Sequence, residues 1–374
     1  MSAPRPASLP ALTGLRFVAA AVVLCEHSAP PVLSSLMDGS VAVTLFFLLS
    51  GFILTYNAPE RVSLRVFYVA RIARIYPVYV LGLLLGALAL SSGTPGVGPG
   101  CASPRAAALP LVLLVQGWVP SVTYCVNSPA WTLSCEAFFY ALFPLLLVAV
   151  RRLALRRLGH VVLLCWSMTL ALPLIFLALH PTGPAELLAL RLIHSVPVAQ
   201  VPAFVFGMIL GHIFVRGVRL PRPALWICLA LASVPVVAVL VPNFAPLRDA
   251  AFWPTLAILL LALAQGQGTA ARVLTLPAVA LLGEASYGLY ILHMPLLSLV
   301  KNLGLLSPGW GDWPAFLAGA VVCVTASLLS LRFVETPCRR AIRAWLAPTS
   351  PRPQDQATCV REARVEDLAP RMVG

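Results

Sequence analysis

The chain has 374 residues, of which 60% are hydrophobic and only 10% are charged, and its mean hydropathy is +0.91. A soluble globular protein carries roughly 25% charged residues, so this composition excludes one and indicates a membrane protein. The formal net charge of +13 could suggest nucleic-acid binding. Arginines that cluster between apolar runs are typical of cytoplasmic membrane loops instead, and we expect no nucleic-acid partner.

The apolar runs are continuous rather than alternating, which favours an all-α polytopic fold over a β-barrel. Ten runs approach the roughly 20 residues that cross a bilayer. In chain order they cover residues 12–30, 39–57, 75–91, 131–150, 160–179, 196–215, 224–241, 251–266, 276–300 and 313–331. We expect a cytoplasmic N-terminus (1–11) that is not a cleaved signal, a membrane domain (12–346), and a disordered cytoplasmic tail (347–374).

The apolar segment 106–118 is short and contains Pro110. If it does not cross the membrane and the N-terminus is cytoplasmic, the basic residues fall on the cytoplasmic side with four exceptions: Arg105, Arg191, Arg248 and Lys301. If it crosses, the later arginine clusters face outward, against the positive-inside rule. We therefore predict about ten transmembrane helices, both termini cytoplasmic, and a re-entrant or interfacial 106–118.

Nine cysteines are scattered along the chain without CxxC spacing, which indicates no metal or redox motif. Cys101 and Cys125 fall in one long outer loop, residues 92–130. A disulfide in an oxidising compartment and two free thiols are equally compatible with this placement. In the second span, the small pair Ser50–Gly51 is typical of close helix packing.

The first span, "LTGLRFVAAAVVLCEH", carries three ionisable groups, Arg16, Glu26 and His27. Arg16 and His27 are eleven residues apart, which places them on one helix face at about 16 Å along the axis. Ionisable groups inside a membrane are usually functional. The alternatives are an arginine that extends to the inner interface and a hydrogen-bonded interfacial histidine. Glu26 points about 100° away from His27, and an outer-interface position accounts for it.

Polar residues also occur in the fourth and ninth spans. We expect Glu136, Tyr290 and His293 in the outer half of the membrane, at the level of His27. A histidine and a carboxylate at one depth can form a general-base pair. Alternatively, Glu136 is a packing carboxylate bonded to a serine or tyrosine, and His293 is a satisfied histidine near a helix end.

Arg71 and Arg74 precede the third span and, at i and i+3, share one helix face. They either anchor the helix at the cytoplasmic interface or form a phosphate-binding pair, since arginine binds phosphate through several donors. With a basic cytoplasmic mouth and a His/Glu cluster at the outer level, a long ligand with an anionic head could reach its reactive end deep into the membrane.

Six motifs follow one another over residues 12–343: R-x10-H from Arg16 to His27, "VAVTLFFLLSGF", "ARIARIYP", "WTLSCEAFFY", "SYGLYILH" and "VETP". Through them the chain resembles the membrane acyltransferase-3 family, which includes glycan O-acetylases and antibiotic-sugar acyltransferases. Thr13 and Thr44 stand where the family often has aspartate, so neither receives a role. The chain resembles the stand-alone type, without an esterase-like domain.

The resemblance implies a multi-pass protein of the cell membrane that moves a short acyl group, acetyl by default, from cytoplasmic acyl-CoA to a sugar hydroxyl. It implies no permanently bound cofactor and no metal. His27 is then the general base and Glu136 orients it or the acceptor. Arg16, Arg71 and Arg74 hold the CoA end. The expected supporting residues are Trp131, Tyr140, Tyr290 and His293.

Two other functions fit parts of this pattern. A proton-coupled transporter could use His27, Glu136 and His293 as a relay, but many transporters have related halves, and the sequence has no visible repeat. A glycan-binding scaffold without activity is the other, and the intact set of histidine, glutamate and arginines argues against it.

Overall fold

The computed structural model describes residues 8–60, 62–92, 101, 103–241, 244–304 and 313–346, and over these ranges it contains helices and no strand. The predicted N-terminal segment up to residue 7 and the predicted tail 347–374 lie outside the described residues. The α-helices are α1 (Pro10–Ser28), α2 (Pro31–Ser34), α3 (Gly39–Tyr56), α4 (Leu64–Ser91), α5 (Pro104–Val112), α6 (Trp131–Arg152), α7 (Leu155–Leu179), α8 (Pro184–Ser195), α9 (Pro197–Val215), α10 (Pro223–Leu240), α11 (Ala245–Ala264), α12 (Thr269–Leu274), α13 (Pro277–Asn302), α14 (Trp313–Ser330) and α15 (Thr336–Leu346).

Nine helical segments of the described residues are long and apolar enough to cross a membrane. They match nine of the ten predicted spans, and the all-α multi-pass membrane architecture is confirmed. The remaining predicted span is α13, which is 26 residues long. Its length suffices, but polar side chains such as Glu284 and His293 lower its mean hydropathy. It packs against α1, α4 and α14 within the bundle.

One helix begins earlier than the sequence predicted, and a further helix precedes another predicted span. α4 starts at Leu64, eleven residues before the predicted span, because its basic first turns are continuous with the apolar part. The predicted sixth span is preceded by α8, and α8 and α9 together form one apolar segment, Pro184–Val215. In both cases charged residues interrupt the apolar run, so the prediction from apolar runs left these helical residues out.

The segment 106–118 does not form a helix long enough to cross the membrane, as predicted. It forms α5, which has nine residues and is therefore about 14 Å long, and a short 3-10 turn at Gln116–Trp118. A bilayer core is about 30 Å thick. Cys101 and Cys125 form a disulfide, which decides between the two alternatives for this pair.

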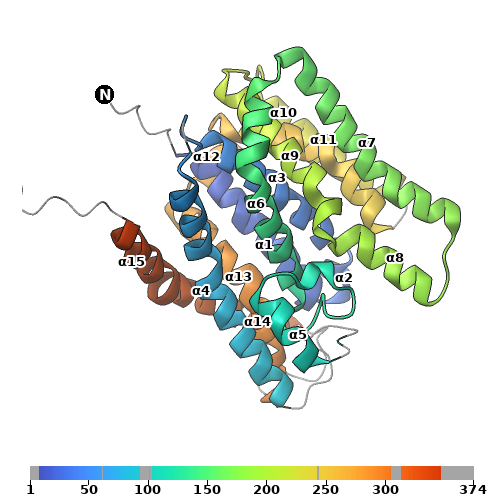
Figure 1. Cartoon of the computed structure of the whole chain (residues 1–374), viewed down its shortest axis with the longest axis vertical. Coiled ribbons are helices and arrows are strands. Elements are labelled where there is room, and N and C mark those ends of the chain that lie inside the picture. The colour runs from blue at the N-terminus through green and yellow to red at the C-terminus, as the bar shows by residue number, and fades with distance from the viewer. Residues whose placement is uncertain are drawn as a thin grey trace, which may run out of the picture.

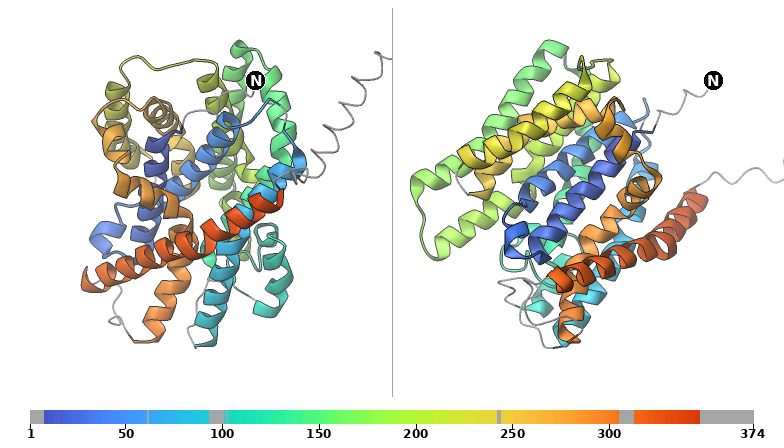
Figure 2. Two further views of the ribbon diagram at one scale, coloured as in Figure 1. Left: turned by 90° about the vertical axis from the view of Figure 1, so that its left-hand side faces the viewer. Right: turned by 180° about the vertical axis from the view of Figure 1, so that it is seen from behind.

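The bundle has the predicted arginine-rich connections at one end (Figure 1). The α6–α7 and α9–α10 connections and α12 lie at the top of this view, and α2 and α5 lie at the bottom. From α14, the chain continues through a π-helical turn, Leu331–Glu335, into α15, and these helices cross the bundle obliquely (Figure 2).

Glycines set how closely the central helices approach. A Cβ atom at Gly207 of α9 would meet the backbone oxygen of Leu48 in α3, and one at Gly51 would meet the backbone oxygen of Phe204. Helix backbones in membranes approach this closely where small residues line the contact. The predicted packing role of Gly51 is thus confirmed, and α3 is held firmly at the centre of the bundle.

Candidate active site

Helix α1 connects two cavities. Arg16 lines the first, which we call the arginine cavity and which encloses about 930 Å³ of empty space, its open mouth included. His27, in the last turn of the same helix, lines the second, the histidine cavity, with about 1120 Å³ measured in the same way. Because α1 is one continuous helix, the predicted separation of about 16 Å between these residues holds.

The arginine cavity collects the three predicted arginines. Arg16 comes from α1, and Arg71 and Arg74 come from the same face of α4. The guanidinium of Arg71 lies 5.7 Å from the ring centre of Tyr140, and its Nε is buried without a hydrogen-bond partner. With Glu136 as the acidic side chain of the lining, the cavity has an excess of positive charge that suits a ligand with several anionic groups.

Glu136 lies in the arginine cavity rather than beside His27. Its carboxylate accepts a hydrogen bond of 3.0 Å from the Tyr140 hydroxyl. The expected His27–Glu136 pair is therefore not what the structure contains. Glu136 is five residues into α6, which starts at Trp131, and five residues advance about 7.5 Å along a helix. Trp131 lines the histidine cavity, whereas Thr132, Leu133 and Glu136 line the other one.

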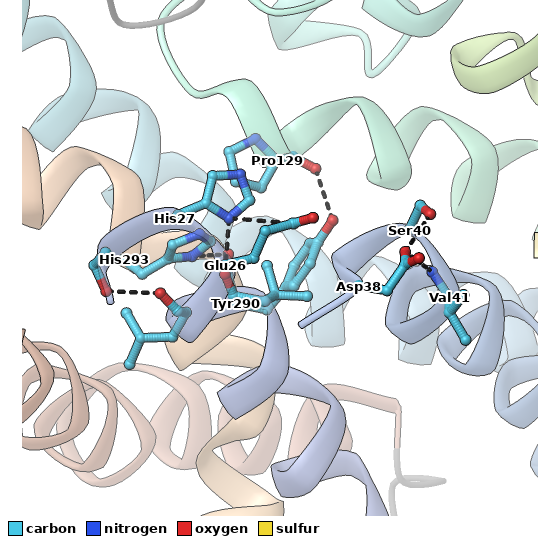
Figure 3. Close-up of polar contacts among 11 residues, drawn as sticks. Glu26, His27, Asp38, Ser40, Val41, Pro129, Tyr290 and His293 are labelled. Atoms are coloured by element: carbon cyan, nitrogen blue, oxygen red, sulfur yellow. Dashed lines mark hydrogen bonds and ion pairs between the residues drawn. The ribbon is translucent and has the colours of Figure 1, made fainter. Parts of the chain in front are cut away.

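The carboxylate next to His27 belongs to Glu26, for which the sequence predicted no role (Figure 3). Glu26 Oε2 lies 3.9 Å from His27 Nδ1, and both side chains are partly exposed, at 38% and 35%. His27 Nδ1 is also 2.7 Å from the Val23 backbone oxygen. A carbonyl oxygen only accepts, so Nδ1 carries the hydrogen and Nε2 keeps the lone pair that a general base needs.

His293 lies behind His27, with 5.3 Å between the two ring centres. It is 1% exposed, its Nδ1 donates to the Tyr290 backbone oxygen at 2.8 Å, and its Nε2 is buried without a partner. The Tyr290 hydroxyl donates to the Pro129 backbone oxygen at 3.3 Å. The structure thus brings together His27, His293, Tyr290 and, on the cavity wall, Trp131.

Residues that the sequence did not single out complete the histidine cavity. Asp38 caps the start of α3 by accepting from the backbone of Val41 and forms an ion pair of 3.2 Å with Arg248. Ser40 Oγ lies within hydrogen-bond distance of both Asp38 Oδ1 and Asp249 Oδ1, at 2.6 and 2.7 Å. The helix-capping pattern around Asp38 was a readable signal, but its pairing with α11 depends on tertiary packing.

The "VETP" motif forms the π-helical turn that ends at Glu335. Glu335 is 2% exposed, and its Oε2 accepts from Arg339 Nη2 at 2.6 Å. A π-turn re-aims a side chain within a helix and is frequent at functional sites. Here its last residue, Glu335, pairs with Arg339 of α15.

The similarity of the chain to known proteins shows that this bundle of helices is a multi-pass membrane acyltransferase. The chain belongs to the acyltransferase-3 family: residues 9–332 match the family model, which is described as an acyltransferase domain. The family resemblance found in the sequence motifs is therefore confirmed.

Two relatives are similar over nearly their whole length. The chain is 32% identical to the acyltransferase MdmB of Streptomyces mycarofaciens, over 91% of this chain and 94% of the relative. It is 29% identical to the exopolysaccharide production protein ExoZ of Rhizobium meliloti, over 82% and 91% of the two chains. No solved structure matches the chain.

Proposed function

We propose that the protein is an O-acyltransferase that moves a short acyl group, acetyl by default, from acyl-CoA to a sugar hydroxyl. The observation that supports this most is the arrangement of two cavities along α1, one basic and one with a histidine. The cavities suit the two ends of one reaction. A phosphate-bearing donor belongs in the first, and its reactive end belongs near His27.

Arg16, Arg71 and Arg74 bind the phosphates of CoA in this proposal. Arginine matches phosphate oxygens with several donors, and the unpartnered Nε of Arg71 is a donor that a ligand can use. Glu136 and Tyr140 hold the arginines in place, since Tyr140 bonds to Glu136 and its ring lies against Arg71. Glu136 is therefore proposed as a support of donor binding.

His27 is the general base. Nε2 removes the proton from the acceptor hydroxyl. At the same time the hydroxyl oxygen attacks the carbonyl carbon of the thioester, so a C–O bond forms. The tetrahedral intermediate then breaks its C–S bond, and the imidazolium returns the proton to the departing CoA thiolate. Glu26, at 3.9 Å from Nδ1, stabilises the positive charge that His27 carries in between.

The acceptor occupies the histidine cavity. Its lining combines hydrogen-bonding side chains, such as Asp38 and Ser40, with the ring of Trp131, and sugars present hydroxyl groups along with apolar faces. The relative ExoZ is named for exopolysaccharide production, which supports a surface glycan as one acceptor. A glycosylated metabolite is the other acceptor class of this proposal. We place the protein in the cell membrane with the arginine cavity and both termini on the cytoplasmic side, where CoA is available.

His27→Ala tests this function. The purified protein in lipid nanodiscs is supplied with acetyl-CoA and a panel of methyl glycosides, and thiol release and acetylated sugar are measured. His27→Ala should lower the rate at least about 100-fold, the usual contribution of a general base. His160→Ala is the matched control, because His160 is an exposed histidine on α7. Acetyl transfer by His27→Ala at a near-wild-type rate would show that the proposed base is wrong.

A proton-coupled transporter has less support. Its relay needs His27, Glu136 and His293 in one connected path. His27 and His293 lie together, but Glu136 lines the other cavity and bonds to Tyr140. Thiol release from acetyl-CoA also separates the two functions, because transport needs no thioester cleavage.

A further inference from the structure

The arginine cavity and the histidine cavity adjoin at two residues. Val43 of α3 and Tyr290 of α13 are the side chains, among the described residues, that line both cavities. Arg16 and the other arginines lie on one side of this pair, and His27 lies on the other. We call Val43 and Tyr290 the dividing pair.

The dividing pair is held firmly. Tyr290 is 8% exposed; the ring of Phe46 packs edge-on against it at 5.6 Å, and its hydroxyl is bonded to Pro129. Val43 is 9% exposed on the helix that packs tightly against α9, and a valine in a helix has one strongly preferred rotamer. Both side chains are therefore fixed in position where the two cavities share their lining.

On the proposed function, a donor must extend past this pair. The phosphate-bearing part of CoA, which is common to all acyl-CoA donors, stays with the arginines, and the pantetheine arm extends from there towards the dividing pair. The acyl group differs between donors, and it is the part that has to pass between Val43 and Tyr290 before the thioester meets His27.

We propose that Val43 and Tyr290 are specificity-determining residues that select acyl groups by their width. Straight-chain acyl groups pass between the two side chains. An acyl group that is branched at the carbon next to the thioester is too wide to pass between them. This inference rests on the proposed acyl-CoA donor and adds which acyl groups the enzyme transfers.

Two isomeric donors test width alone. Butyryl-CoA and isobutyryl-CoA have the same atoms and the same charge, but only the second is branched next to the thioester. The measured quantity is the ratio of kcat/KM for isobutyryl-CoA to that for butyryl-CoA, from thiol release in nanodiscs. We expect Val43→Ala to raise this ratio about tenfold, the lower end of what one methylene is worth in a fitted pocket. Val43→Ile should lower it, which gives a second variant of opposite sign.

Two controls separate width from general damage. Ile53→Ala shortens a side chain that lines the arginine cavity away from the dividing pair, so it should change both donors alike and leave the ratio unchanged. Val43→Thr replaces one methyl group by a hydroxyl of nearly the same size, so the ratio should also stay the same.

A ratio that does not change in Val43→Ala and Val43→Ile, while wild type uses acetyl-CoA, overturns the width selection and leaves the proposed function intact. An equal change of the ratio in Ile53→Ala also overturns it, because the effect is then not specific to the pair. If wild type releases thiol from no donor, the proposed function fails and the width selection fails with it.

Discussion

His27 illustrates how one residue obtains a defined chemical state from its neighbours. The Val23 carbonyl fixes the hydrogen on Nδ1, so Nε2 is the nitrogen that can accept a proton. Glu26 lies on the Nδ1 side, opposite to the reacting nitrogen. Its charge favours the imidazolium that forms as the acceptor loses its proton, and it acts through His27 rather than on the substrate.

Glu26→Gln tests this positioning role. The pair is partly exposed, and an exposed ion pair is worth at most about 1 kcal/mol, so kcat for acetyl transfer should fall up to about fivefold. KM for acetyl-CoA should not change, because the donor lies mainly in the other cavity. Glu186→Gln on the exposed surface of α8 is the control. A higher KM for acetyl-CoA with an unchanged kcat would assign Glu26 to donor binding instead.

At the scale of helices, the sequence predicted what lies within one element and missed what depends on two. The Arg16–His27 spacing and the shared face of Arg71 and Arg74 follow from 3.6 residues per turn. The level of Glu136 relative to His27 depends on the offset between α6 and α1, which no periodicity encodes. No role was predicted for Glu26 because it leaves the helix about 100° away from His27. This angle does not determine where the end of a long side chain lies.

The packing of α3 against α9 was predictable only from one side. The sequence showed that Gly51 permits a close approach of another helix. It did not show that this helix is α9 or that Gly207 and Gly211 of α9 pack closely against α3. This contact holds Val43 and Ser40 in their places on α3, one at the dividing pair and one beside Asp38. The shape of both cavities therefore depends on the glycine contact between α3 and α9, formed by Gly51, Gly207 and Gly211, none of which is catalytic.

Gly207→Ala tests the glycine contact between α3 and α9. The added methyl group would meet the Leu48 backbone oxygen, and overpacking of this kind costs about 1–3 kcal/mol. We expect a lower Tm in detergent, measured by intrinsic fluorescence during thermal unfolding. Gly159→Ala is the matched control, since a Cβ there meets open space. If both variants unfold at the wild-type temperature, α3 and α9 are not packed as described.

At the scale of the whole molecule, charge is distributed in two ways. The chain carries a net charge of +13, and its arginine-bearing connections gather at one end of the bundle (Figure 1). Within the bundle, three arginines face one glutamate in the arginine cavity, and Glu26 and Asp38 face Arg248 in the histidine cavity. An anionic donor is thus favoured in the first cavity and a neutral or cationic acceptor in the second.

This division predicts that donor binding and chemistry can be separated, and one measurement tests it. CoA affinity and acetyl transfer are measured on the same nanodisc samples of His27→Ala and of Arg71→Ala, with Arg157→Ala on the exposed face of α7 as the control. His27→Ala should bind CoA with the wild-type Kd and transfer acetyl groups at least about 100-fold more slowly, whereas Arg71→Ala should bind CoA about tenfold more weakly, as expected for a lost hydrogen bond to a charged group. Equal loss of CoA affinity in both variants, or transfer by His27→Ala at the wild-type rate, would contradict the account of two cavities with separate tasks.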